Sequence, residues 1–212
     1  MLVVPSSLQG EEGLYRCIAN ILKNSSSLSH FIKSPVVSGN EGGILMSEKF
    51  YKIFKKNSLH KKIEIEMPQY LPGEDNYYAL IKKYKELGYI QVIVSSDLML
   101  FLLKHYFQIR KGKISEFTLM EDDEEFHDEV RNIIKIVNRQ RDMFSILLNH
   151  LRFLRDENSI EIQKISITVP ESSGPSLFIN IQSNGIVEID SPQNEYEKNE
   201  VKKQVEYFYE SI

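Results

Sequence analysis

The turn around Gly10 is the place where this sequence comes nearest to a phosphate-binding loop. An apolar run ending at Val4 leads into a turn with two glycines, Gly10 and Gly13, and then into a segment with helical spacing. A phosphate loop presents backbone amides at a helix N-terminus and follows them with Lys and Ser or Thr. Here Glu11 and Glu12 follow Gly10, and their carboxylates repel a phosphate. An ordinary turn with acidic helix capping fits the same residues.

Other residues suited to catalysis are isolated in the sequence. Asp97 ends an apolar run, which suggests a metal-dependent nuclease or phosphohydrolase as an alternative function. Such a site needs further carboxylates at neighbouring strand ends, because divalent cations take several oxygen ligands. The five histidines show no zinc-site spacing, so we predict no bound metal. A capping role for Asp97 is the simpler interpretation.

Two basic stretches could contact RNA. Lysines alternate with aromatic residues between Lys49 and Lys62, and a second group lies between Lys104 and Lys113. Lysines neutralise phosphates and aromatic rings stack on unpaired bases. The chain as a whole is acidic, with 26 Lys and Arg against 30 Asp and Glu, so a solvated surface is the alternative. The predicted contact residues are Lys52, Lys55, Lys56, Lys104, Arg110 and Lys111.

The hydrophobic pattern predicts an α/β fold, with helices at 45–54, 77–87 and 98–107 and strands at 61–67, 90–94 and 114–119. Gly88 is predicted to end the helix at 77–87 in the left-handed conformation. A strand, a helix and a second apolar strand predict a parallel βαβ unit, and hence a mostly parallel sheet with helices on both faces. A long helical pattern follows over 121–155.

The pattern changes after Asn158. Three short strands near 162–167, 177–181 and 186–189 precede a helix over 194–209. Asn184-Gly185 predicts a tight hairpin turn between the last two strands. We therefore predict a domain at 1–158 and a small antiparallel β element with a C-terminal helix at 159–212.

Composition restricts the compartment. A single cysteine, Cys17, cannot form a disulfide within the chain, which favours a reducing environment. The N-terminus lacks the basic region of a secretory signal, and the longest apolar stretch is too short to cross a bilayer. The sequence predicts an intracellular protein without a membrane anchor.

The order of these segments resembles the family of RNA 5′-hydroxyl polynucleotide kinases that includes a pre-mRNA cleavage-factor subunit. The likeness is collinear over about residues 1–180, and its main block is IEIEMPQYLPGEDNYYALIKKYKELGYIQVIVSSDLMLFLLKHYF. Glu11 and Glu12 stand where the family has its phosphate-loop lysine and serine. His127 and Arg131 stand where it has two arginines of a lid helix. The stretch 162–170 is similar to the start of the family's C-terminal β-domain.

The resemblance implies a shortened, non-catalytic relative with a P-loop-like sheet, in other words a pseudokinase. Gly10, Glu11, Glu12 and Gly13 would be a vestigial phosphate loop, and no bound ATP or other cofactor is expected. The implied role is a nuclear, protein-bridging scaffold in pre-mRNA 3′-end cleavage and polyadenylation, with other subunits and RNA as partners. An unrelated α/β adaptor protein is the other alternative.

Overall fold

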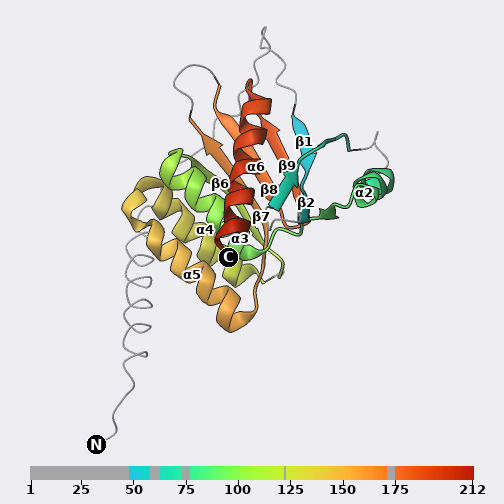
Figure 1. Cartoon of the computed structure of the whole chain (residues 1–212). Coiled ribbons are helices and arrows are strands. Elements are labelled where there is room, and N and C mark those ends of the chain that lie inside the picture. The colour runs from blue at the N-terminus through green and yellow to red at the C-terminus, as the bar shows by residue number, and fades with distance from the viewer. Residues whose placement is uncertain (1–47, 58–62, 73–76, 122, 171–174) are drawn as a thin grey trace, which may run out of the picture. The chain divides into compact units, whose positions relative to one another are not determined.

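A computed structural model describes residues 48–57, 63–72, 77–121, 123–170 and 175–212 (Figure 1). All of them belong to one compact unit, Leu45–Ile212. The apolar run ending at Val4, the turn from Gly10 to Gly13 and the segment with helical spacing that follows it lie outside the described residues.

The main sheet has six strands, and every pairing in it is antiparallel. Its order is β4 (Gln69–Tyr70), β1 (Lys49–Lys52), β9 (Ile186–Asp190), β8 (Leu177–Gln182), β7 (Ile162–Val169), β6 (Lys113–Leu119). The predicted mostly parallel, P-loop-like sheet is therefore wrong. Strands β7, β8 and β9 form a meander of consecutive strands. Gly185, with a φ of 80°, allows the predicted hairpin turn between β8 and β9.

The strands expected as a separate C-terminal element lie at the centre of this sheet. Strand β7 pairs with β6 on one side, and β9 pairs with β1 on the other. The predicted boundary between 158 and 159 therefore runs through a single sheet. Long-range pairing of this kind leaves no mark on local composition.

A second sheet of three strands has the order β3 (Ile63–Glu66), β2 (Phe54–Asn57), β5 (Ile90–Gln91). Strands β3 and β5, which flank α2, both pair antiparallel with β2, so they run in the same direction but are separated by β2 and do not pair with each other as the predicted βαβ unit requires. Strand β1 and the first residue of β2 also lie within the segment predicted as a helix over 45–54. The aromatic and β-branched residues there favour strands once they pair across a sheet.

Helix α2 (Tyr77–Glu86) is confirmed, and so is its stop signal. Gly88 has a φ of 83°, its N–H donates to the Lys85 carbonyl, and the Tyr89 N–H donates to the Tyr84 carbonyl. This pair of bonds is a Schellman motif, which satisfies carbonyls at the helix end. None of the α2 residues is buried.

The remaining helices are α3 (Ser96–Lys104), which continues as a π-helix (His105–Ile109), α4 (Glu124–Arg139), α5 (Phe144–Asn158) and α6 (Asn194–Ser211). The segment predicted as a single helix over 121–155 is thus two helices, α4 and α5, with a 3₁₀ turn at Arg141–Met143 between them. Alternate positions of β7, β8 and β9 hold buried apolar side chains, the pattern of a sheet with one face in the core, and Ser166 and Asn180 between them are buried as well.

Candidate nucleic-acid interface and the groove between α4 and β6

Two of the predicted RNA-contact residues are already engaged within the protein. Lys52 is fully buried in β1, and its ammonium donates a hydrogen bond to the Asn184 carbonyl. Arg110 donates two hydrogen bonds to the buried carboxylate of Glu197 in α6, a bidentate contact with N···O distances of 2.9 and 3.2 Å. Neither cation is free to meet a phosphate.

Two others lie on different elements. Lys104 is in the last turn of α3 and lines a hollow of about 490 Å³ together with Asp97 and Tyr209. Lys111 follows the π-helix, is exposed, and has a φ of 58°. These positions supply single charges and share no element with an exposed aromatic platform.

Lys55 and Lys56 of β2 lie beside aromatic rings. The Lys55 ammonium is 4.0 Å from the ring centroid of Tyr209, and that of Lys56 is 5.2 Å from Tyr89. Lys56 also donates to the Leu87 carbonyl at 2.9 Å. Phe54 stacks on Tyr84 at 4.4 Å between centroids, which holds α2 against β2. The structure therefore joins this part of the predicted basic stretch to α2.

The exposed side of α2 carries a tyrosine in line with two lysines. Tyr78 is 83% exposed, and Lys82 and Lys85 follow it at helical positions i+4 and i+7. Side chains at such spacing lie on one face, about 5–6 Å apart at each step. Lys83 lies next to this row, with its ammonium 5.9 Å from the Tyr84 ring.

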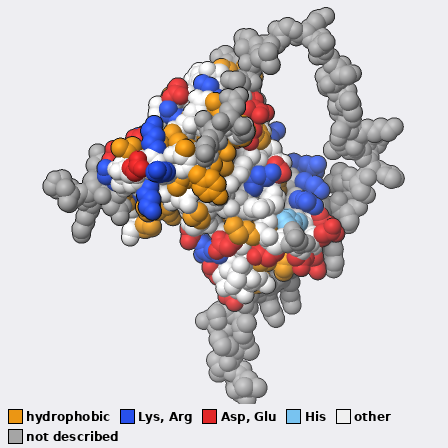
Figure 2. Space-filling view, turned by 90° about the vertical axis from the view of Figure 1, so that its right-hand side faces the viewer, with side chains coloured by type: hydrophobic (Ala, Val, Ile, Leu, Met, Phe, Trp, Pro, Cys, Tyr) orange, Lys and Arg blue, Asp and Glu red, His pale blue; other side chains and the backbone are white. Residues whose placement is uncertain are grey.

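We call these residues the lysine–tyrosine surface: Lys56, Tyr78, Lys82, Lys83, Lys85 and Tyr89. In the described part of the chain, the lysines that form ion pairs are Lys164, Lys198 and Lys202, and none of them belongs to this surface. Figure 2 shows basic and hydrophobic side chains next to one another on the side that carries α2. The lysines lie beside the exposed ring of Tyr78 and the half-buried ring of Tyr89, an arrangement that suits a single-stranded nucleic acid.

The Tyr89 ring remains neutral over a wide pH range. Burial, with a hydrogen bond to Glu64, raises its pKa to about 12. Sequence reasoning missed Tyr78, Lys82, Lys83 and Lys85, although the alternation in YYALIKKYKELGY shows aromatic and basic residues together.

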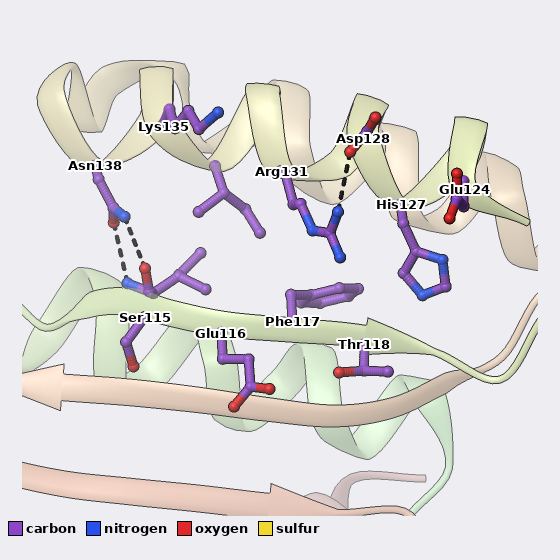
Figure 3. Close-up of a pocket in the computed structure, with 12 residues that line it drawn as sticks. Ser115, Glu116, Phe117, Thr118, Glu124, His127, Asp128, Arg131, Lys135 and Asn138 are labelled. Atoms are coloured by element: carbon purple, nitrogen blue, oxygen red, sulfur yellow. Dashed lines mark hydrogen bonds and ion pairs between the residues drawn. The ribbon is translucent and has the colours of Figure 1, made fainter. Parts of the chain in front are cut away.

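The predicted lid residues His127 and Arg131 both lie on α4 and line one groove, of about 640 Å³, between this helix and β6 (Figure 3). The Leu119 N–H donates to Nε2 of His127 at 3.1 Å, and Nδ1 lies 2.9 Å from the Asp123 carbonyl oxygen. Nε2 therefore accepts and Nδ1 carries the proton. Arg131 donates to Asp128 at 3.0 Å.

Asn138 closes the other end of the groove. Its amide accepts from the Ile114 N–H at 3.0 Å and donates to the Ile114 carbonyl at 2.8 Å, as a neighbouring strand would. Helix α4 thus covers the edge of β6 with polar side chains, which is a recognised way to protect an edge strand. Since both ring nitrogens of His127 are occupied, the groove is better suited to structure than to acid–base chemistry.

The described residues do not assemble the metal site that the nuclease alternative requires. Asp97 lies in the first turn of α3 and forms an ion pair with Arg155 of α5. Over the described ranges, no three His, Cys, Asp or Glu side chains are grouped as metal ligands. In the same part of the chain, no helix has the length and apolarity needed to cross a membrane.

Comparisons with family models, with curated proteins and with solved structures give no match to this chain.

Proposed function

We propose that this chain is a non-catalytic subunit that binds single-stranded RNA on the lysine–tyrosine surface and contributes to an RNA-processing assembly. The observation that carries the proposal is the row of Tyr78, Lys82 and Lys85 on α2. The ring offers a face on which a base can stack, and the two ammonium groups lie at a spacing that can follow the backbone. A duplex, whose bases are already stacked, gains less from the exposed ring.

The RNA-processing part of the proposal comes from the sequence resemblance. That resemblance has lost its support from the fold, because a kinase scaffold requires a parallel sheet and the six-stranded sheet is antiparallel. Pre-mRNA 3′-end cleavage, nuclear location and a protein-bridging role remain predictions from sequence. RNA binding has its own basis in the lysine–tyrosine surface and can be tested without them.

The test is fluorescence anisotropy with a labelled oligouridylate of about 16 nucleotides. Tyr78→Ala should weaken binding about 10-fold, since stacking on one aromatic ring contributes about 1–3 kcal/mol. Tyr78→Phe should bind like the wild type, because stacking needs the ring and not the hydroxyl. Lys82→Ala with Lys85→Ala should lower the slope of log affinity against log salt by about 1.4, or 0.7 for each lost phosphate contact.

The matched controls are Tyr196→Ala and Lys203→Ala, which remove an exposed ring and an exposed cation from α6. Both should leave the affinity unchanged. The proposal fails if the wild type does not bind the RNA at about 50 mM salt, or if the control variants weaken binding as much as the α2 variants do. Equal competition by poly-glutamate would also contradict it, because it would show attraction to any polyanion.

A further inference from the structure

The hollow of about 490 Å³ that Lys104 lines opens between α3, α5 and the C-terminal end of α6. Figure 1 shows the end of α6 beside α3, and the ring of Phe101 in α3 is 5.5 Å from that of Phe208 in α6, between centroids. Pockets that hold small molecules have volumes of about 300–1,000 Å³. The hollow is therefore large enough for a small ligand.

Much of the lining is apolar and belongs to three different helices. Leu100 and Phe101 come from α3, Leu148 from α5 and Phe208 from α6. The rings of Phe101 and Phe208 pack against the core on one side and remain half-buried. Apolar surface that is still in contact with water gains free energy when an apolar molecule covers it.

Cations from three elements converge on the same hollow. Lys104 of α3 and Arg152 of α5 line it, and both are exposed. Lys55 of β2 lies next to it, because its ammonium is 4.0 Å from the ring centroid of Tyr209, which also lines the hollow. None of the ion pairs among the described residues includes any of these three cations.

The carboxylates near these cations are bound by another residue. Asp97, which lines the hollow, forms an ion pair with Arg155. Asp156, which experiences the charge of Arg152, lies 2.7 Å from the same Arg155. Since Arg155 balances these carboxylates, Arg152 and Lys104 remain available to an anion from solution.

We propose that this hollow binds a small amphipathic anion, a molecule with an apolar body and one carboxylate or phosphate head group. The apolar body covers the rings of Phe101 and Phe208, and the head group lies between Lys104 and Arg152. The guanidinium fork of arginine matches carboxylate and phosphate equally well, so the two head groups share one chemistry. The inference is independent of RNA binding, because none of these residues belongs to the lysine–tyrosine surface.

The test is isothermal titration calorimetry of the full chain with decanoate and with decyl phosphate, each kept below its micelle-forming concentration. At least one of them should bind with one molecule per chain, and the tighter of the two identifies the head group. It should bind about 10-fold more tightly than decanol, which has the same chain without the charge. Decyltrimethylammonium should bind more weakly than decanol, because the cations of the hollow repel it.

Two double variants separate the hollow from the rest of the surface. Lys104→Gln with Arg152→Gln should weaken binding of the anion about 10-fold and leave the affinity for decanol unchanged. The matched control, Lys135→Gln with Arg139→Gln, removes two exposed cations from α4 and should have no effect.

The absence of binding by both anions would overturn the proposal. So would equal binding of decyltrimethylammonium, or a control variant that weakens binding as much as the Lys104 and Arg152 variant does. Binding to vesicles of anionic lipid without binding of either soluble anion would also contradict it, since the site would then recognise a membrane surface.

Discussion

Replacing Lys52 with methionine should stabilise the protein. Lys52 is 0% exposed, its ammonium bonds to the Asn184 carbonyl, and none of the ion pairs among the described residues includes it. Burial lowers its pKa from 10.5 to about 8. A buried ammonium without a counter-ion disfavours the folded state, and methionine fills a similar volume without the charge.

The size of the effect follows from the pKa change. A difference of about 2.5 between unfolded and folded pKa corresponds to about 3 kcal/mol at neutral pH. Losing the bond to Asn184 offsets about 1 kcal/mol of this gain. Lys52→Met should therefore raise the free energy of unfolding by about 2 kcal/mol at pH 7.

The pH dependence provides the sharper test. Between pH 8 and 10.5 the unfolded chain holds the Lys52 proton and the folded chain does not. The stability of the wild type relative to Lys52→Met should therefore rise across this window, and the advantage of the variant should shrink to about zero by pH 10. Urea unfolding at pH 7 and pH 10, followed by circular dichroism, measures both values. A variant that is less stable than the wild type at pH 7, with the same difference at pH 10, would refute the reasoning.

Two further substitutions test contacts that hold the helices in place. Asn138→Ala should lower the free energy of unfolding by about 2 kcal/mol in urea titrations, because it leaves the N–H and C=O of Ile114 without their partner; an unchanged midpoint would contradict the edge-covering role. Arg110→Met should cost about 3 kcal/mol, since Glu197 stays buried and unpaired, whereas adding Glu197→Leu should recover most of that loss. A double variant no more stable than Arg110→Met would exclude this explanation.

Local signals in the sequence predict correctly where an element ends when a glycine conformation defines that end. Gly88 ends α2 and Gly185 forms the hairpin turn, both with the positive φ that glycine accepts readily. Strand pairing was not predictable in the same way. The apolar run at 90–94 has the composition of a central parallel strand, yet only Val92 and Val94 are buried, and Ile90 is exposed. Composition does not reveal which strand pairs with which.

The same limit applies to the candidate site. The spacing of His127 and Arg131 places them on one face of α4, and they do share a groove. The basic stretch around Lys55 and Lys56 was visible in the sequence, but its neighbour in space, α2, was not. Lys52 belongs to that stretch in sequence but is buried, because β1 lies between β4 and β9 and the 183–185 turn lies over its ammonium.

Net charge is a poor guide to what this chain binds, because local charge determines the potential at a surface. The whole chain has a formal charge of −4. Residues 77–89 contain three lysines and one glutamate, which gives 3 − 1 = +2. At about 0.1 M salt, charges more than about 10 Å away are largely screened. A phosphate approaching Tyr78 therefore experiences the lysines of α2, together with Glu86 and Glu64 beside them, more strongly than the carboxylates elsewhere in the chain. Added salt should then weaken RNA binding, whereas repulsion by the whole acidic chain would predict the opposite trend.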